Sequence, residues 1–116
     1  MKEKCDFYKK EKLIAKRVKY CRSLRSRILG LMFVHGPGNG ALLPDVNAIH
    51  MNFVRFNLRI VWLDKDFTVL DQITARKWRL YNGPEGARHV LELPADKKYD
   101  IKNGDKLRIK IYEDKK

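Results

Sequence analysis

A strict alternation of apolar residues in the middle of the chain constrains the fold more than any other feature of the sequence. The apolar positions of this series are Val54, Phe56, Leu58, Ile60 and Trp62. A period of two is that of a β-strand with one face in the core. We therefore predict a strand over residues 49–63, with Ile60 and Trp62 buried. If its register runs back unbroken, His50 and Asn52 lie at the end of the same core face.

Shorter patterns of the same kind predict further strands over residues 12–20, 67–75, 89–93 and 106–112. Lysine and arginine at positions 16, 17 and 19 favour an edge position for the first of these. Asp64 is predicted to serve the hairpin turn at 64–66, and Ser23 to cap a short helix over residues 24–32. The predicted fold is mainly β, a compact antiparallel β-sandwich or small barrel with one short helix near the N-terminus.

The positive charge of the chain is concentrated at its beginning. The net charge is +12, and residues 1–27 hold eleven Lys/Arg against three Asp/Glu. We divide the 116 residues into a charged arm, 1–11, and a single β-rich domain, 12–116. The basic region is either a solvated face or a surface for weak, sequence-independent contact with nucleic acid.

Several classes of protein are disfavoured by what the sequence lacks. No apolar run is long enough to span a membrane, and the first residues lack the apolar core of a signal peptide, so we expect a cytoplasmic protein without membrane contact. Cys5 and Cys21 are expected to be free thiols. A zinc site that combined them with His35, His50 or His89 would lack the usual ligand spacing. We therefore predict no metal and no cofactor.

Several segments, in this order and spacing, resemble the uncharacterised family known as domain of unknown function 192. They are Arg27 to Met32, Ile49 to Phe56, Val61 to Asp64, Trp78, Ala87-Arg88, Val90 to Ala95, Ile101, Gly104-Asp105 and Leu107. The resemblance covers about residues 18–112 and implies a compact β-sandwich, but no activity. Members commonly carry proline and aspartate where this chain has Asn57 and Arg59, so any acid–base role of that aspartate is not expected here.

Four polar or aromatic residues of these segments form the candidate ligand-binding site: His50, Arg55, Trp78 and Glu92. An arginine fork and a protonatable imidazole both donate to oxygen atoms, and tryptophan stacks on sugars or bases. We predict that they line one cleft for an anionic or hydroxylated ligand.

Each of the four also has a structural alternative. His50 can be hydrogen-bonded to backbone, Arg55 exposed to solvent, and Trp78 a cap on the sandwich. Glu92 can form a salt bridge to Arg88 or Arg55.

Three functional hypotheses follow from these residues. The first is a small binding or accessory module with the polar cleft just described. The second is a hydrolase or transferase that uses His50 and Glu92. The third is weak, non-specific nucleic-acid binding through the basic N-terminal region. No nucleophile motif or metal triad is present in the sequence. Whether the protein is an enzyme, and its oligomeric state, stay open.

Overall fold

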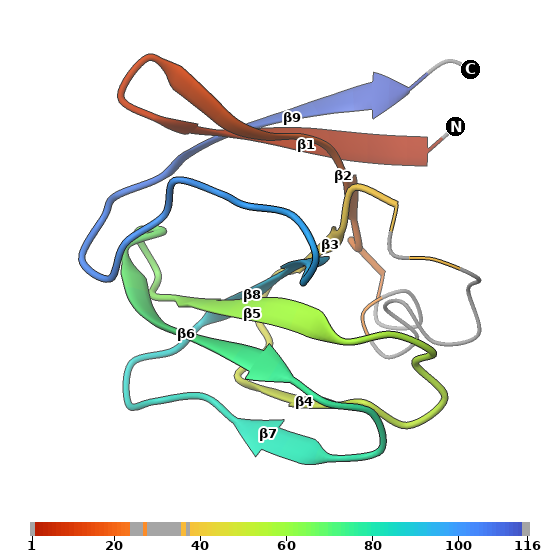
Figure 1. The fold of residues 1–116 in the computed structure, drawn as a ribbon. Helices are drawn as coiled ribbons and strands as arrows, with labels where there is room; N and C mark the ends of the chain where they lie inside the picture. The colour runs from red at the N-terminus through yellow and green to blue at the C-terminus, as the bar shows by residue number, and fades with distance from the viewer. Residues whose placement is uncertain (1, 24–26, 28–35, 37, 115–116) are drawn as a thin grey trace.

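Nine strands account for the regular structure of the described residues, which are 2–23, 27, 36 and 38–114 of a computed structural model (Figure 1). The strands are β1 Lys2–Lys9, β2 Lys12–Tyr20, β3 Ala41–Leu43, β4 Ala48–His50, β5 Leu58–Leu63, β6 Val69–Ala75, β7 Leu80–Asn82, β8 His89–Pro94 and β9 Arg108–Asp114. The predicted mainly β fold is therefore confirmed. The predicted helix at 24–32 lies outside the described residues except for Arg27, whose N–H donates to the Ser23 carbonyl at 3.0 Å.

Seven strands form one hydrogen-bonded sheet in the order β6-β5-β8-β3-β2-β1-β9, and β4 pairs with β7 in a separate two-stranded sheet. All neighbours in the large sheet are antiparallel except β2 and β3, which are parallel. Figure 1 shows β9 and β1 at one end of the molecule and the β4–β7 pair at the other.

This pairing does not support the finer prediction of a sandwich or barrel, because one continuous ladder runs through all seven strands and its two edges are not paired along their length. The edges approach each other at one point. Thr68, just before β6, forms an isolated antiparallel bridge with Lys106, just before β9. The Leu107 N–H donates to the Phe67 carbonyl beside it at 3.0 Å.

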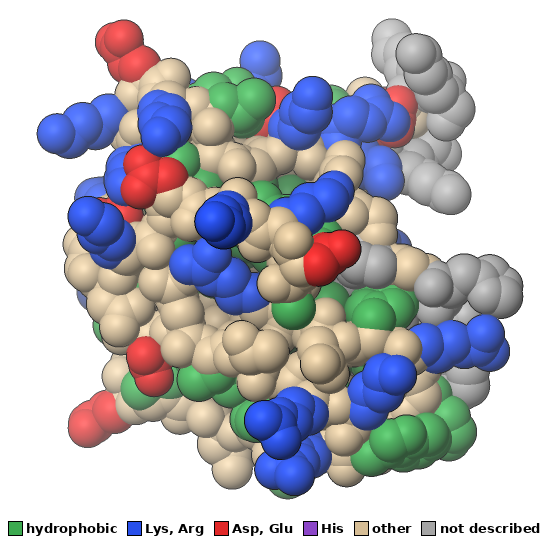
Figure 2. All heavy atoms as spheres, viewed as in Figure 1, with side chains coloured by type: hydrophobic (Ala, Val, Ile, Leu, Met, Phe, Trp, Pro, Cys, Tyr) green, Lys and Arg blue, Asp and Glu red, His purple; other side chains and the backbone are tan. Residues whose placement is uncertain are grey.

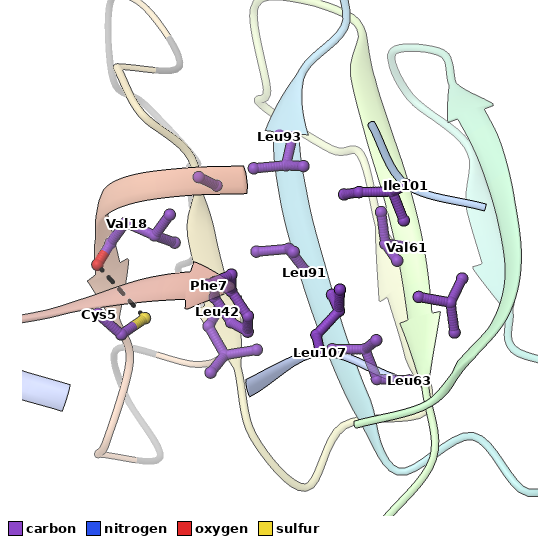
Figure 3. Close-up of a cluster of buried hydrophobic side chains, with 12 residues drawn as sticks. Cys5, Phe7, Val18, Leu42, Val61, Leu63, Leu91, Leu93, Ile101 and Leu107 are labelled. Atoms are coloured by element: carbon purple, nitrogen blue, oxygen red, sulfur yellow. Dashed lines mark hydrogen bonds between the residues drawn. The ribbon is translucent and has the colours of Figure 1, made fainter. Parts of the chain in front are cut away.

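Each face of the large sheet carries its own core. The first cluster contains Phe7, Leu42, Val61, Leu63 and Leu91, among others (Figure 3). The second, between the large sheet and the β4–β7 pair, includes residues that alternate with these along the same strands. Its members on β5 are Leu58, Ile60 and Trp62. Ile60 and Trp62 are buried, as predicted, and β5 is apolar on both faces because both are covered.

The predicted strand over 49–63 is interrupted. Its first part is β4 and its last part is β5, while residues 51–57 form a turn and loop between them. The break includes Phe53, whose φ of 62° lies in the left-handed region. His50 and Trp62 therefore do not share one strand face, and the register argument that put His50 on the core face is wrong.

The N-terminal segment that we predicted to be a charged arm contains an interior strand. Strand β1 lies between β2 and β9, and its Cys5 and Phe7 side chains are fully buried in the first core. Figure 3 shows the Cys5 thiol near the carbonyl of Val18, to which it donates at 3.6 Å. Strand β2, predicted at an edge, is likewise interior, so lysine and arginine here mark a solvated sheet face.

Candidate functional site

Two loops that follow strands β4 and β6 meet at the side of the β4–β7 pair. They are residues 51–57 and 76–79. The fully buried Met51 holds them together through its backbone: its N–H donates to the Arg79 carbonyl at 2.7 Å, and its carbonyl accepts from Trp78 N–H at 3.0 Å. The same carbonyl accepts from Val54 N–H at 3.3 Å. Because Met51 follows β4 and Arg79 precedes β7, the pairing of these two strands fixes both loops relative to each other.

Two aromatic side chains project from these loops and meet. The rings of Phe53 and Trp78 are 5.1 Å apart between centroids and inclined by 68°, an edge-to-face pair. They are nevertheless exposed, Phe53 by 47% and Trp78 by 62%. Leu80, the first residue of β7, is exposed by 70%. Neighbouring exposed apolar side chains of this size mark interaction sites more often than isolated ones do.

The backbone at both aromatic residues is in an unfavourable conformation. Phe53 has φ 62° and Trp78 has φ 64°, a region where an L-residue with a bulky side chain costs about 1–2 kcal/mol. Both residues nevertheless remain exposed, so the strained backbone does not place either ring in the core. Strain that does not serve core packing is a feature of binding and catalytic sites.

A pocket of about 380 Å³ lies against this aromatic pair. Its lining residues are Phe53, Val54, Arg55, Lys77 and Trp78. Figure 2 shows hydrophobic and Lys/Arg side chains side by side at the lower right, over the loops that join β4 to β5 and β6 to β7. We name the exposed side chains of these loops, Phe53, Arg55, Arg76, Lys77, Trp78 and Arg79, the aromatic–basic site.

Of the four residues singled out in the sequence, the structure brings Arg55 and Trp78 together in this pocket. Phe53 and Lys77 complete it and were not selected. In a continuous strand over 49–63, Phe53 would alternate with Val54 and lie on the face away from the core, a position that the break at 51–57 abolishes. Lys77 could have been found, since Arg76-Lys77-Trp78-Arg79 surrounds a tryptophan with three cations.

His50 does not line the pocket. Ile49 faces the second core, so the alternation of β4 directs the neighbouring His50 to the opposite face. The His50 Nδ1 atom is buried and has no hydrogen-bond partner within the described part of the chain. The backbone hydrogen bond that served as the structural alternative is therefore not made by this atom.

Glu92 lies in the middle of β8, opposite Ala41 on one side and Ile60 on the other. Its side chain points away from those of Leu91 and Leu93 and is only 5% exposed. Burial raises the pKa of Glu92 to about 7, a rise that Lys19 partly opposes. The Oε1 atom has no hydrogen-bond partner among the described residues.

The salt bridge to Arg88 considered for Glu92 is not formed, since Arg88 Nε pairs with Asp45 at 2.7 Å. The alternation of β4 and β8 gives no indication that His50 and Glu92 face each other. Ile49, not His50, lies in the second core toward which Glu92 points.

The thiols and imidazoles proposed as metal ligands are dispersed. Burial raises the pKa of Cys5 to about 12 and that of Cys21 to about 11, and both are free. His89 stacks on Phe67 with 4.7 Å between centroids, and its Nδ1 accepts from Asp45 N–H at 3.0 Å. His35 lies outside the described residues. Within the described ranges, no three His, Cys, Asp or Glu side chains are grouped so as to hold a metal ion.

Four of the eleven basic residues in 1–27 form ion pairs with acidic residues of the described chain. Lys9 contacts Asp105 at 3.1 Å and Arg22 contacts Glu3 at 2.6 Å. Lys12 and Arg17 have carboxylate partners as well. No helix of the described residues has the length and apolar character needed to cross a membrane.

Comparison with known proteins agrees with the resemblance seen in the sequence. The model of the DUF192 family, described as Uncharacterized ACR, matches residues 7–109, and the chain belongs to this family. Similar curated proteins are UPF0127 proteins of archaea. That of Thermococcus gammatolerans is 35% identical over 97 residues, which cover 77% of this chain and 63% of the relative. That of Pyrococcus horikoshii is 35% identical over 99 residues, 78% of this chain and 85% of the relative.

A UPF0127 protein of Thermococcus kodakarensis is 33% identical over 97 residues, 77% of this chain. The chain thus spans less than two thirds of the length of two of these relatives. A crystal structure of a protein of unknown function from Novosphingobium aromaticivorans has the same fold, with a TM-score of 0.69 at 19% identity. The match covers 90% of this chain and 83% of that one.

Proposed function

We propose that the protein is a small binding module whose aromatic–basic site takes an anionic or highly hydroxylated ligand. The observation that carries this proposal is the joint occurrence, around one pocket, of two cationic side chains and two exposed aromatic rings on a left-handed backbone. Arginine and lysine donate hydrogen bonds to phosphate, carboxylate and hydroxyl oxygens, and an aromatic face packs on the apolar side of a sugar or base.

The rival proposal of a hydrolase or transferase finds less support. It needs His50 and Glu92 within reach of one another and of a common substrate. His50 lies on the face of β4 opposite Ile49, and neither residue lines the pocket that holds Arg55 and Trp78. The binding module needs no such meeting of acid and base.

Binding of inorganic polyphosphate and of a neutral oligosaccharide, measured by calorimetry, tests this function. Lys77→Ala removes a cation of the pocket, and Lys65→Ala removes an exposed lysine from the turn at the opposite end of the β5–β6 hairpin. Weakened binding in Lys77→Ala but not in Lys65→Ala supports the site. Equal weakening in both variants, or no binding of either ligand, contradicts it.

A further inference from the structure

The charge of the aromatic–basic site has one sign only. Residues 51–57 and 76–80 contain four Lys/Arg and no Asp or Glu. The ion pairs found among the described residues involve the cations Lys9, Lys12, Arg17, Arg22 and Arg88. Arg76, Lys77 and Arg79 belong to none of these pairs and are exposed. The charge of these three cations, which no carboxylate of the described residues pairs, favours a ligand with several negative charges.

The two aromatic rings indicate that the ligand has a feature besides its negative charge. A phosphate or sulfate chain would be held by Lys77 and its neighbours without any ring. Trp78 instead presents most of its indole to solvent, and Phe53 supports that indole edge-to-face at 5.1 Å. The Trp78 N–H bond to the Met51 carbonyl fixes the backbone from which the ring projects. A planar group that stacks on the indole completes this arrangement.

The extent of the cations indicates a ligand longer than one small molecule. Arg76 and Arg79 are exposed on the same loop as Trp78 but do not line the pocket. Small-molecule pockets usually enclose most of their ligand, whereas here both rings lie open to solvent. Stacking rings flanked by cations along an open surface are the arrangement by which proteins bind single strands.

We propose that the aromatic–basic site binds single-stranded nucleic acid, with a base stacked on Trp78, which Phe53 supports, and the adjoining phosphates on Arg55, Lys77 and Arg79. The proposal rests on the function proposed above and narrows its ligand to one that carries both phosphates and bases. In this proposal the surface that contacts nucleic acid is formed by loops 51–57 and 76–79, and not by the basic N-terminal region. Since stacking does not distinguish bases, binding is expected to depend little on sequence.

The test compares two labelled oligonucleotides of about ten nucleotides by fluorescence anisotropy, one with bases and one abasic throughout. The two have equal charge and length, so any difference between them measures stacking. The oligonucleotide with bases is expected to bind about tenfold more tightly, and this preference is expected to disappear in Trp78→Asn. Asparagine tolerates the left-handed backbone at this position. Leu13→Asn, which removes an exposed apolar side chain without a ring from β2, outside the aromatic–basic site, should keep the preference.

Salt dependence tests the phosphate contacts separately. For single strands, each phosphate contact contributes about −0.7 to the slope of log K against log salt. Lys77→Ala should flatten the slope by about this amount, and Lys65→Ala should leave it unchanged. Phe53→Asn, at the other left-handed aromatic position, provides a second ring variant if Trp78→Asn does not fold by circular dichroism.

The outcomes separate this inference from the function on which it rests. If the abasic strand binds as tightly as the strand with bases and Lys77→Ala weakens both, the anionic site stands and the nucleic-acid inference is overturned. Absence of binding to either strand, to polyphosphate and to the oligosaccharide overturns both. A preference for bases that survives in both ring variants, or a mononucleotide that binds as tightly as the strand, also overturns the inference.

Discussion

Replacement of Glu92 by glutamine should stabilise the protein at alkaline pH, because the native carboxyl is buried in an apolar layer. Its side chain lies on the second-core face of β8, beside Ile60, and is only 5% exposed. The pKa of Glu92 is about 7 in the fold against 4.5 for an exposed glutamate. Each pKa unit corresponds to about 1.4 kcal/mol, so ionisation of the folded protein costs about 3 kcal/mol of stability.

The sign of the pH dependence follows from proton binding. Between pH 4.5 and about 7 the folded state keeps the Glu92 proton while the unfolded state loses it. The free energy of unfolding therefore falls as pH rises through this window. Glutamine is neutral throughout, so the advantage of Glu92→Gln over the parent should grow by about 2.5 kcal/mol from near pH 5 to near pH 8. This corresponds to a difference in melting temperature of about 10 °C.

Urea unfolding of parent and variant at the two pH values measures this difference. Burial lowers the pKa of His89, which makes stability fall as pH drops below the ordinary histidine range, the opposite sign. Because His89 is common to both proteins, its contribution cancels in the difference. The exposed Glu85→Gln serves as the control for net charge. A Glu92→Gln advantage that is the same at both pH values would refute the assignment of a buried, neutral carboxyl.

Three further changes probe the packing. Gly40→Ala should destabilise the protein by about 2 kcal/mol or more in urea unfolding, because Gly40 has φ 94° and a Cβ there would collide with the Glu92 carbonyl. Trp62→Ala should cost about 3–5 kcal/mol, the usual range for a large buried aromatic, and a cost below about 1 kcal/mol would place Trp62 at the surface. Cys5 and Cys21 should react with a thiol reagent at neutral pH only after unfolding, because burial raises both pKa values.

Local sequence patterns predicted a strand correctly where a single alternating pattern coincides with a single strand of the structure. The hairpin of β5 and β6 and the turn at Asp64 followed from alternation and turn residues, and Asp64 Oδ1 indeed accepts from the Asp66 and Thr68 N–H groups at 2.8 and 2.9 Å. Strand β1 was missed although Cys5 and Phe7 alternate with polar residues there. Its lysines suggested solvent, while its burial depends on pairing with β9 at the other end of the chain.

The candidate site was predicted in part for a similar reason. Arg55 and Trp78 carry chemistry that is visible in the sequence, so both were selected. Their meeting depends on two backbone hydrogen bonds of Met51 to residues of the second loop, and on left-handed conformations at Phe53 and Trp78. Neither residue is a glycine or asparagine, the residue types that normally indicate a left-handed conformation in a sequence. Because the alternating pattern continues through Phe53, the sequence predicted a strand where the structure has the loop 51–57.

The pairing of β1 with β9 bears on how the chain reaches its native state. Tyr112 Oη donates to Asp6 at 3.0 Å across a separation of 106 residues, whereas β1 and β2 are joined by a tight hairpin. On the ribosome the β1–β2 hairpin can form as soon as it emerges, but one edge of β1 stays unpaired until β9, residues 108–114, has been synthesised. Contacts of such long range slow folding, and an unpaired edge is open to association with other chains during the delay. Lysine on an unpaired strand disfavours such association, so the exposed lysines of this hairpin suit a strand whose edge stays in solvent before it is covered.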